Sequence, residues 1–470
     1  MKLPDSIRPF GLSALVGLFA AGLVGPTVCA RPPARPNILV FICDDLSARD
    51  LPAYGATDVR APHTDRLAAS GMVFERAFIV SPACAPSRAA MLTGLYPTRN
   101  GATANHSYKR DDVASLPAVL AGLGYQTAAF GKVAHGPKDT GRHGFVNATN
   151  NNKFDPAEIA AWLQQRDRSR PVALFAGTHA PHVPWPANHG YDPATLRIPR
   201  FHYDTPETRA DRARYYTDVT QGDTDFGAVV EMARRELGPD TLVIFTSDHG
   251  AQWPFGKWNL YDEGICVPLI IAWPGHIPAG TRTAANISWL DLLPTLIDVA
   301  GGDVPAGLDG RSFAPVLTTP GTPHRDRIFT THDHDGRANV YPIRSVRTAG
   351  WKYIRNLQPG WIHSNHSDRF RKDGTARYFE SWEAAAVHDP HAAFVLTRYR
   401  QRPAEELYDL AADPDELNNL AADSRHAATL VALRGELDVW MESQSDAGVA
   451  AIKAQPWLPG DPGLVGPDLR

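Results

Sequence analysis

The sequence has little cysteine, no excess of basic residues and, after its first 30 residues, no long hydrophobic run. Only 4 of 470 residues are cysteine, so a disulfide framework like that of small exported domains is not expected. Lys and Arg number 47 against 51 Asp and Glu, and this balance argues against nucleic acid as a partner. What is present, 43% hydrophobic and 21% charged residues, predicts a large folded core rather than a disordered chain.

Residues 1–30 are typical of a secretory signal peptide. Two basic residues precede an apolar run over residues 10–24, and small residues lead to a cleavage site after Ala30. A membrane anchor is the alternative, but the run is short for a span and glycine interrupts it. Lipid modification of Cys29 is disfavoured because the preceding residues lack the usual Leu and small-residue pattern. We expect an exported protein, periplasmic or secreted (lysosomal in a eukaryote), without a stable membrane span.

Short β-branched runs alternate with helical patterns through the first two thirds of the chain. The alternation predicts an α/β fold with a doubly wound sheet, in which polar residues after the strand ends gather at one edge. The expected strands are 37–43, 125–130, 171–177, 240–246 and 267–272. The expected helices are 64–69, 114–122, 156–166 and 209–237.

The pattern changes beyond about residue 324. Two segments that alternate with period two, 344–347 and 351–355, predict a hairpin, with a third strand at 406–409 and a helix at 427–441. These elements predict a smaller C-terminal α+β subdomain. The expected division is a signal peptide (1–30), a catalytic domain (36–324), the subdomain (325–454) and a Pro- and Gly-rich tail (455–470).

The string Cys84-Ala-Pro-Ser-Arg88, followed by Thr93-Gly94, is the most specific in the chain. Pro86 suits the first turn of a helix, which places Cys84 at an N-terminus where free N–H groups favour an anion. Arg88 lies one turn further on the same side and suits sulfate or phosphate oxygens. The alternative interpretation is a helix start that carries a free cysteine.

Two acidic clusters follow predicted strands. Asp44 and Asp45 come after the first strand, and Asp248 and His249 come after the strand at 240–246. Together they offer oxygen ligands and one imidazole to a divalent cation, and Ca²⁺ suits a site dominated by oxygen. Taken alone, a pair of aspartates after a strand favours a helix cap over a metal site.

The Cys84 string and these clusters resemble the type I sulfatases. The resemblance covers about residues 37–441 and implies an alkaline-phosphatase-like fold with a mixed sheet flanked by helices. It implies that a formylglycine-generating enzyme oxidises Cys84 to formylglycine. It further implies one Ca²⁺ per chain, held by Asp44, Asp45, Asp248 and His249 with modified residue 84.

Four more basic residues match sulfatase motifs in order and spacing. The resemblance implies that Lys132 and Lys257 hold sulfate oxygens together with Arg88, and that His135 orients residue 84 and acts as a base. His179, in His-Ala-Pro-His, would protonate the leaving group. The second histidine, His182, is interpreted as structural or as part of the pocket edge. Three histidines stay unassigned: His63, His332 and His334.

Several stretches are most similar to the sulfamidase (heparan N-sulfatase) branch, including 240–248, 259–261, 341–346 and 407–420. Three details depart from it and are partly like iduronate sulfatases: His249, Lys257 and the spacing before His135. The expected activity is hydrolysis of sulfate esters or sulfamates on a sulfated saccharide. The alternatives are a phosphonate or phosphate diester hydrolase of the same superfamily, and an inactive exported glycan-binding protein.

Overall fold

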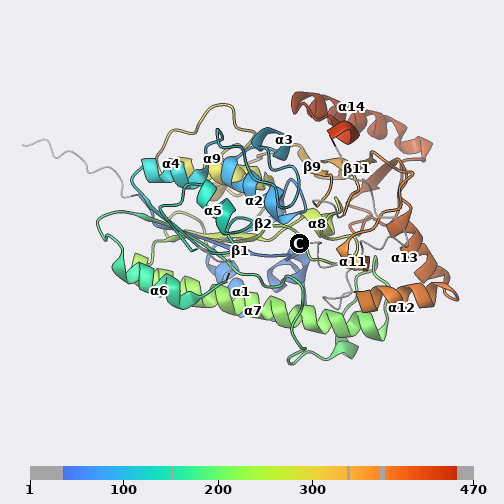
Figure 1. Cartoon of the computed structure of the whole chain (residues 1–470), viewed down its shortest axis with the longest axis horizontal. Helices are drawn as coiled ribbons and strands as arrows, with labels where there is room; N and C mark the ends of the chain where they lie inside the picture. Colours follow the sequence, from blue (N-terminus) through green and yellow to red (C-terminus); the bar gives the residue numbers. More distant parts are fainter. Residues whose placement is uncertain (1–34, 150–152, 336–338, 370–375, 452–470) are drawn as a thin grey trace, which may run out of the picture. The chain divides into compact units, whose positions relative to one another are not determined.

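The computed structural model describes residues 35–149, 153–335, 339–369 and 376–451 (Figure 1). The expected signal peptide and tail lie outside the described residues. Among the helices of the described part, none combines the length and the hydropathy that a membrane crossing requires. The three cysteines in this part, Cys43, Cys84 and Cys266, are free thiols.

The larger sheet has eight strands and is mixed, as expected. β7 runs antiparallel to both neighbours and the remaining pairs are parallel. Strand β1 is buried on both faces, which explains its uninterrupted apolar sequence. In spatial order the strands are β4 (Asn147–Ala148), β3 (Gln126–Gly131), β5 (Val172–Gly177), β1 (Ile38–Cys43), β6 (Leu242–Ser247), β7 (Leu269–Ala272), β2 (Met72–Phe78) and β8 (Thr281–Ser288).

Helices cover both faces of this sheet, as Figure 1 shows. One face carries α1 (Pro62–Ser70), α6 (Pro156–Gln165) and the long α7 (Pro206–Leu237). Thr205 caps α7 by accepting the N–H of Thr208, and Phe226 of α7 packs edge-on against the rings of β1 and β6. The other face carries α2 (Cys84–Thr93), α4 (Leu116–Gly122) and α9 (Leu292–Val299).

The smaller sheet is antiparallel and has four strands. The expected hairpin is β10 (Ile343–Arg347) and β11 (Trp351–Asn356), and the expected third strand is β12 (Glu405–Asp409) beside β11. The sequence did not indicate β9 (Ile328–His332), which completes the sheet beside β10. The remaining helices are α3 (Pro97–Asn100), α5 (Pro137–Arg142), α8 (Asp262–Ile265), α10 (Ala314–Thr318), α11 (His366–Arg369), α12 (Ala376–Ala386), α13 (Pro390–Arg400) and α14 (Ala427–Ser443).

A buried polar network, which we call the joint, links the smaller sheet to the loop before α8. Its centre is Glu406, whose carboxylate accepts hydrogen bonds from Arg402 (2.7 and 3.0 Å), Asn356 (2.7 Å), Tyr261 (2.7 Å) and Tyr408 (2.6 Å). Burial opposes ionisation of this carboxyl, but Arg402 and the hydrogen-bond donors outweigh it and lower the pKa of Glu406 to about 2. The joint is therefore a fully paired ionic centre.

Candidate active site

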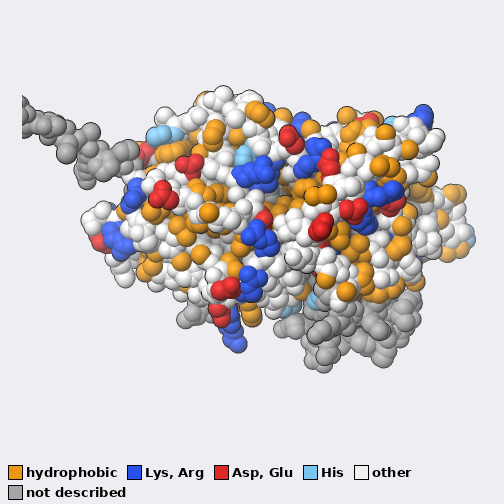
Figure 2. All heavy atoms as spheres, turned by 90° about the horizontal axis from the view of Figure 1, so that it is seen from above, with side chains coloured by type: hydrophobic (Ala, Val, Ile, Leu, Met, Phe, Trp, Pro, Cys, Tyr) orange, Lys and Arg blue, Asp and Glu red, His pale blue; other side chains and the backbone are white. Residues whose placement is uncertain are grey.

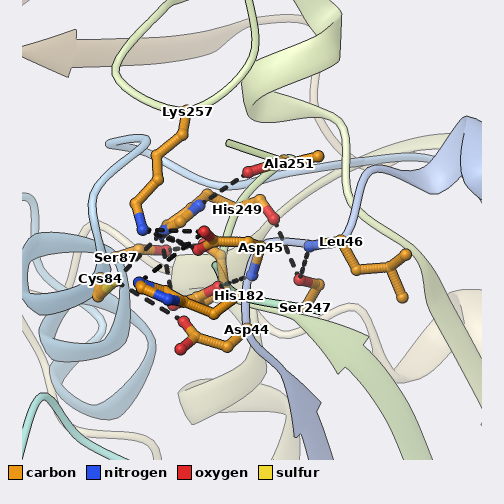
Figure 3. A network of polar contacts seen from close by, with 12 residues as sticks. Asp44, Asp45, Leu46, Cys84, Ser87, His182, Ser247, His249, Ala251 and Lys257 are labelled. Carbon is orange, nitrogen blue, oxygen red and sulfur yellow. Dashed lines mark hydrogen bonds and ion pairs between the residues drawn. The ribbon is translucent and has the colours of Figure 1, made fainter. Parts of the chain in front are cut away.

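Two polar pairs meet where β1 and β6 end. The strands are in register up to Cys43 opposite Ser247, so Asp44 and Asp45 emerge beside Asp248 and His249. The Asp45 N–H donates to Asp248 Oδ1 at 3.1 Å, and Asp45 takes a left-handed conformation (φ 69°) that turns the chain directly after the strand. These four residues and Cys84, all buried, form what we call the strand-end cluster (Figure 3).

Helix α2 begins at Cys84 and presents the thiol to this cluster. The Sγ atom lies 3.3 Å from His249 Nε2, 3.6 Å from Lys132 Nζ and 3.7 Å from Asp44 Oδ1. Burial opposes ionisation of the thiol, but the ammonium groups of Lys132 and Lys257 outweigh it and lower the pKa of Cys84. Residue 84 therefore occupies a position that favours an anion, as the helix-start argument predicts.

Arg88 faces carboxylates and is completely buried. Its guanidinium donates to Asp248 Oδ2 at 2.9 Å and to Asp44 Oδ1 at 3.2 Å, and also contacts the Lys132 carbonyl. All three guanidinium nitrogens are thereby engaged within the protein. The geometry shows Arg88 bracing two aspartates of the strand-end cluster rather than facing an open space.

Two buried lysines pair with the two aspartates that follow β1. Lys132, directly after β3, lies 2.5 Å from Asp44 Oδ2, and Lys257 lies 2.9 and 3.0 Å from the oxygens of Asp45. Figure 3 shows the Lys257 side chain extending toward Asp45 from a loop separate from the one that carries Asp45. The expected basic residues from distant parts of the sequence thus meet at one edge of the sheet.

The predicted histidines occupy different positions around the cluster. His179 is half-exposed and its Nδ1 lies 3.7 Å from Asp44 Oδ2. His182 is less exposed than His179, and its Nε2 lies 4.0 Å from Asp45 Oδ2. His135 pairs with His106 through a 2.8 Å contact between Nε2 and Nδ1, and within the described part of the chain its ring makes no hydrogen bond to Cys84.

Of the unassigned histidines, His63 and His332 are engaged elsewhere. The ring of His63 contacts Arg66 on α1, and His332 Nε2 lies 3.0 Å from the Asn339 carbonyl. Asn105 is a residue of the site region that the sequence did not indicate as part of the site. Its Oδ1 accepts the N–H of Ala85 at 2.9 Å, next to Cys84, and only its place after a turn-rich segment signals such a role.

The strand-end cluster fits a divalent cation. Ligand atoms of Asp44, Cys84, Asp248 and His249 lie within 4.8 Å of one another, and so do those of Asp44, Asp45 and His182. His249 Nδ1 lies 3.0 Å from the Gly250 carbonyl, which directs Nε2 toward the cluster as second-shell contacts of metal ligands do. Burial opposes protonation of His249, yet Asp248 and its neighbours raise its pKa to about 9, so a proton or a cation neutralises the same surplus negative charge.

Charges of both signs are interspersed on the face seen in Figure 2. Lys and Arg side chains alternate there with Asp and Glu, and no broad area of one sign dominates this face. This distribution agrees with the balanced composition of the chain. It gives no support on that face to binding of a long polyanion by charge alone.

The sequence matches two family profiles. The profile described as Sulfatase matches residues 36–302, and the one described as N-sulphoglucosamine sulphohydrolase, C-terminal, matches residues 249–361. N-sulphoglucosamine sulphohydrolase from Homo sapiens is 31% identical over 479 residues, which cover 89% of this chain and 92% of the relative.

Two solved structures illustrate how widely the fold is shared. A protein determined in complex with its substrate D-glucosamine-2-N,6-O-disulfate aligns with a TM-score of 0.66 and 22% identity, over 88% of this chain and 99% of that one. The phosphonate monoester hydrolase of Agrobacterium radiobacter aligns with a TM-score of 0.67 and 22% identity, over 87% and 96%. The expected alkaline-phosphatase-like architecture is thereby confirmed.

Proposed function

This chain belongs to the sulfatase family, and we propose on that basis that it hydrolyses sulfamates or sulfate esters of a sulfated saccharide at the strand-end cluster. The observation that carries the proposal is the position of Cys84. The residue of the family's C-x-P-S-R motif opens α2 and lies within 3.7 Å of Asp44, Lys132 and His249. That setting favours an anionic nucleophile and an anionic substrate group.

We infer that Cys84 is converted to formylglycine by a formylglycine-generating enzyme, and that Ca²⁺ is held by Asp44, Asp45, Asp248, His249 and residue 84. The buried oxygen-rich donor set supports the cation. When present, a hydrated aldehyde at residue 84 would supply a nucleophilic hydroxyl and a second hydroxyl that would permit release of sulfate, and the cation would supply Lewis-acid chemistry.

The protein's own residues divide into two groups. Lys132 and Lys257 place positive charge beside residue 84, where it stabilises negative charge that develops on the sulfo oxygens. Arg88 is a positioning residue, because it holds Asp44 and Asp248 in place. His179, half-exposed at the edge of the cluster, protonates the departing amine or alcohol, and His135 accepts a proton during release of sulfate.

A sulfamate is the favoured substrate type. The C-terminal profile and the human relative both carry the name of an N-sulphoglucosamine sulphohydrolase, and they support the N-sulfo group of a glucosamine as the group removed. A phosphonate or phosphate diester remains the second candidate substrate, because a phosphonate monoester hydrolase shares the fold. The remaining alternative is an exported glycan-binding protein in which Cys84 stays a thiol.

The export signal and the division near residue 324 are also part of the proposal. Cleavage after Ala30 would deliver the enzyme to the periplasm, the extracellular space or a lysosome, where sulfated saccharides are degraded. The change from the mixed sheet to the antiparallel sheet, which begins with β9 at Ile328, supports a catalytic domain followed by a subdomain.

One experiment tests these assignments together. The purified full-length protein is assayed on matched N-sulfated, O-sulfated and phosphonate model substrates, with Cys84→Ala as the inactive control and Cys266→Ala as the matched cysteine control. Mass spectrometry of the peptide that contains residue 84 reports the aldehyde. We expect fastest turnover of the N-sulfated substrate. Faster turnover of the phosphonate would overturn the sulfamate assignment, and an unmodified thiol with no turnover would favour the binding protein.

A further inference from the structure

Three side chains from distant segments form a line that leads to His135. Asp335 follows β9, and its Oδ1 lies 3.6 Å from His106 Nε2. His106 Nδ1 in turn lies 2.8 Å from His135 Nε2, with the two rings edge-on. His106 has a left-handed backbone (φ 61°), an uncommon conformation that the surrounding contacts must maintain.

The protonation pattern along this line follows from the carboxylate. Asp335 Oδ1 is buried and, within the described ranges, accepts no hydrogen bond from another group; its nearest charged partner is His106 Nε2 at 3.6 Å, an ion-pair distance. A carboxylate oxygen can only accept, so the nitrogen that faces it is the one that carries hydrogen. His106 therefore bears its proton on Nε2 and accepts at Nδ1. His135 must then donate from Nε2, which leaves a lone pair on its Nδ1.

His135 Nδ1 is an unused acceptor. The atom is buried and makes no hydrogen bond to any residue that the structure describes. Burial, reinforced by the nearby ammonium of Lys132, lowers the pKa of His135 to about 4, so the ring is neutral at pH 7. The other charged groups that face the ring are Arg88, Asp139 and Asp335. A neutral ring whose open lone pair is buried suits a proton acceptor.

We propose that Asp335 and His106 are positioning residues that hold His135 as the Nε2–H tautomer and so present Nδ1 as the proton acceptor of the reaction. This inference rests on the proposed function for the identity of the reaction, but the tautomer itself does not depend on it. The proton taken by Nδ1 gives an imidazolium and is later lost to water, so the histidine pair is restored after each turnover.

Asp335 has a second connection to the nucleophile region. Its Oδ2 accepts from Asn105 Nδ2 at 3.2 Å and from Asn339 Nδ2 at 3.4 Å. Asn105 Oδ1 in turn accepts the N–H of Ala85. Both amide groups donate to Oδ2 of Asp335, which leaves Oδ1 for His106. The buried carboxylate of Asp335 thus orders the backbone beside residue 84 through Asn105 and the ring of His135 through His106.

The substitution Asp335→Asn tests the chain of tautomers. Because Asn105 and Asn339 both donate to the Oδ2 position, the new amide NH₂ group occupies the Oδ1 position and donates to His106 Nε2. The histidine pair must then reverse, and His135 carries its proton on Nδ1. We expect kcat to fall about 10–100-fold with little change in KM, as for the loss of an outer-shell partner.

The direct readout is ¹⁵N NMR of histidine-labelled full-length protein, with His135 assigned by its absence from His135→Gln. An unprotonated Nδ1 in the wild type and a protonated Nδ1 in Asp335→Asn support the proposal. A protonated Nδ1 in the wild type, or the same tautomer in both proteins, overturns it. Asp333→Asn is the matched control, because Asp333 lies on the same segment and pairs with Arg344 instead.

A further variant distinguishes the proposed relay from a general loss of structure. His106→Leu removes the link, so adding Asp335→Asn to it should produce no further change in kcat. Additive losses in the double variant would overturn the relay. If the wild type shows the expected tautomer yet hydrolyses no sulfated substrate, the proposed function fails while the positioning of His135 stands.

Discussion

The strand-end cluster and the joint are both buried and charged, yet they are built in opposite ways. In the joint, one carboxylate, Glu406, receives five hydrogen bonds, and the pKa of Glu406 is held at about 2. In the strand-end cluster, three carboxylates crowd around one thiol and one imidazole, and burial raises the pKa of Asp45 to about 7 against the pull of Lys257.

The difference separates a structural contact from a binding site. A fully paired buried ion needs no ligand, and removing one partner leaves an uncompensated charge. A crowded set of like charges is stable only with added positive charge, and a cation together with lysines supplies it. Two substitutions and two changes of conditions test this difference between the strand-end cluster and the joint.

The largest effect is expected for Asp45→Asn in the strand-end cluster. Removing this charge weakens the cation site and leaves Lys257 without its partner, so kcat on the best substrate should fall by roughly 10³-fold. The free energy of unfolding should change less than in the joint variant below, because removing this charge also relieves the repulsion of Asp45 by Asp44 and Cys84. Retention of more than a tenth of the wild-type kcat would show that Asp45 is not part of the cation site.

Glu406→Gln is the matched change in the joint. It leaves the buried Arg402 uncompensated and should lower the free energy of unfolding by about 3–5 kcal/mol, as measured by urea denaturation. The kcat of the folded fraction should stay close to wild type at low temperature. A loss of kcat without a loss of stability would contradict the distinction between the two regions.

Removal and return of Ca²⁺ should affect only one of the two regions. A cation that binds the folded state raises the free energy of unfolding by about 2.7 kcal/mol at 100 times its dissociation constant. Calorimetry after chelation should show this rise on adding Ca²⁺ to wild type and to Glu406→Gln, but a much smaller rise for Asp45→Asn. Equal rises in all three proteins would place the cation elsewhere.

The contribution of the joint to the free energy of unfolding should decrease gradually as the pH falls. The pKa of Glu406 falls from an ordinary value of 4.5 to about 2 on folding, so its stabilisation is complete above about pH 4.5 and is lost as the pH falls toward 2. The stability difference between wild type and Glu406→Gln should therefore shrink over that interval. A difference independent of pH would mean that Glu406 is not ionised in the folded protein.

The sequence predicts the fold wherever the hydrophobic pattern is continuous. β1, β5 and β6 are fully buried runs, and α7 begins at a Thr-Pro start signal; these elements were predicted within a few residues. β2 and β8 were missed for physical reasons. β2 contains Glu75-Arg76 at an irregularity in its pairing, and β8 is polar and partly exposed, so neither shows a clear apolar run.

For the candidate site, the sequence predicts the members better than their contacts. The prediction that Asp44 and Asp248 lie together is confirmed because they follow the neighbouring strands β1 and β6, and Cys84 joins them from the start of α2. Motif order gave no indication that Arg88 faces carboxylates, or that His182 approaches Asp45. These contacts depend on how distant segments are placed in the folded protein. The sequence alone does not show which carboxylates the guanidinium group of Arg88 will bind.

Lys257 owes its position to the residues on either side of it. Phe255 and Trp258 are bulky and buried, yet both have left-handed backbones (φ 70° and 65°), and such conformations cost about 1–3 kcal/mol each. The guanidinium of Arg398 lies 4.5 Å from the Phe255 ring, and Arg402 donates to Asn259 at 3.1 Å. Chimeras that exchange C-terminal segments between relatives must therefore carry these two arginines, since a foreign segment would let the loop relax and withdraw its lysine.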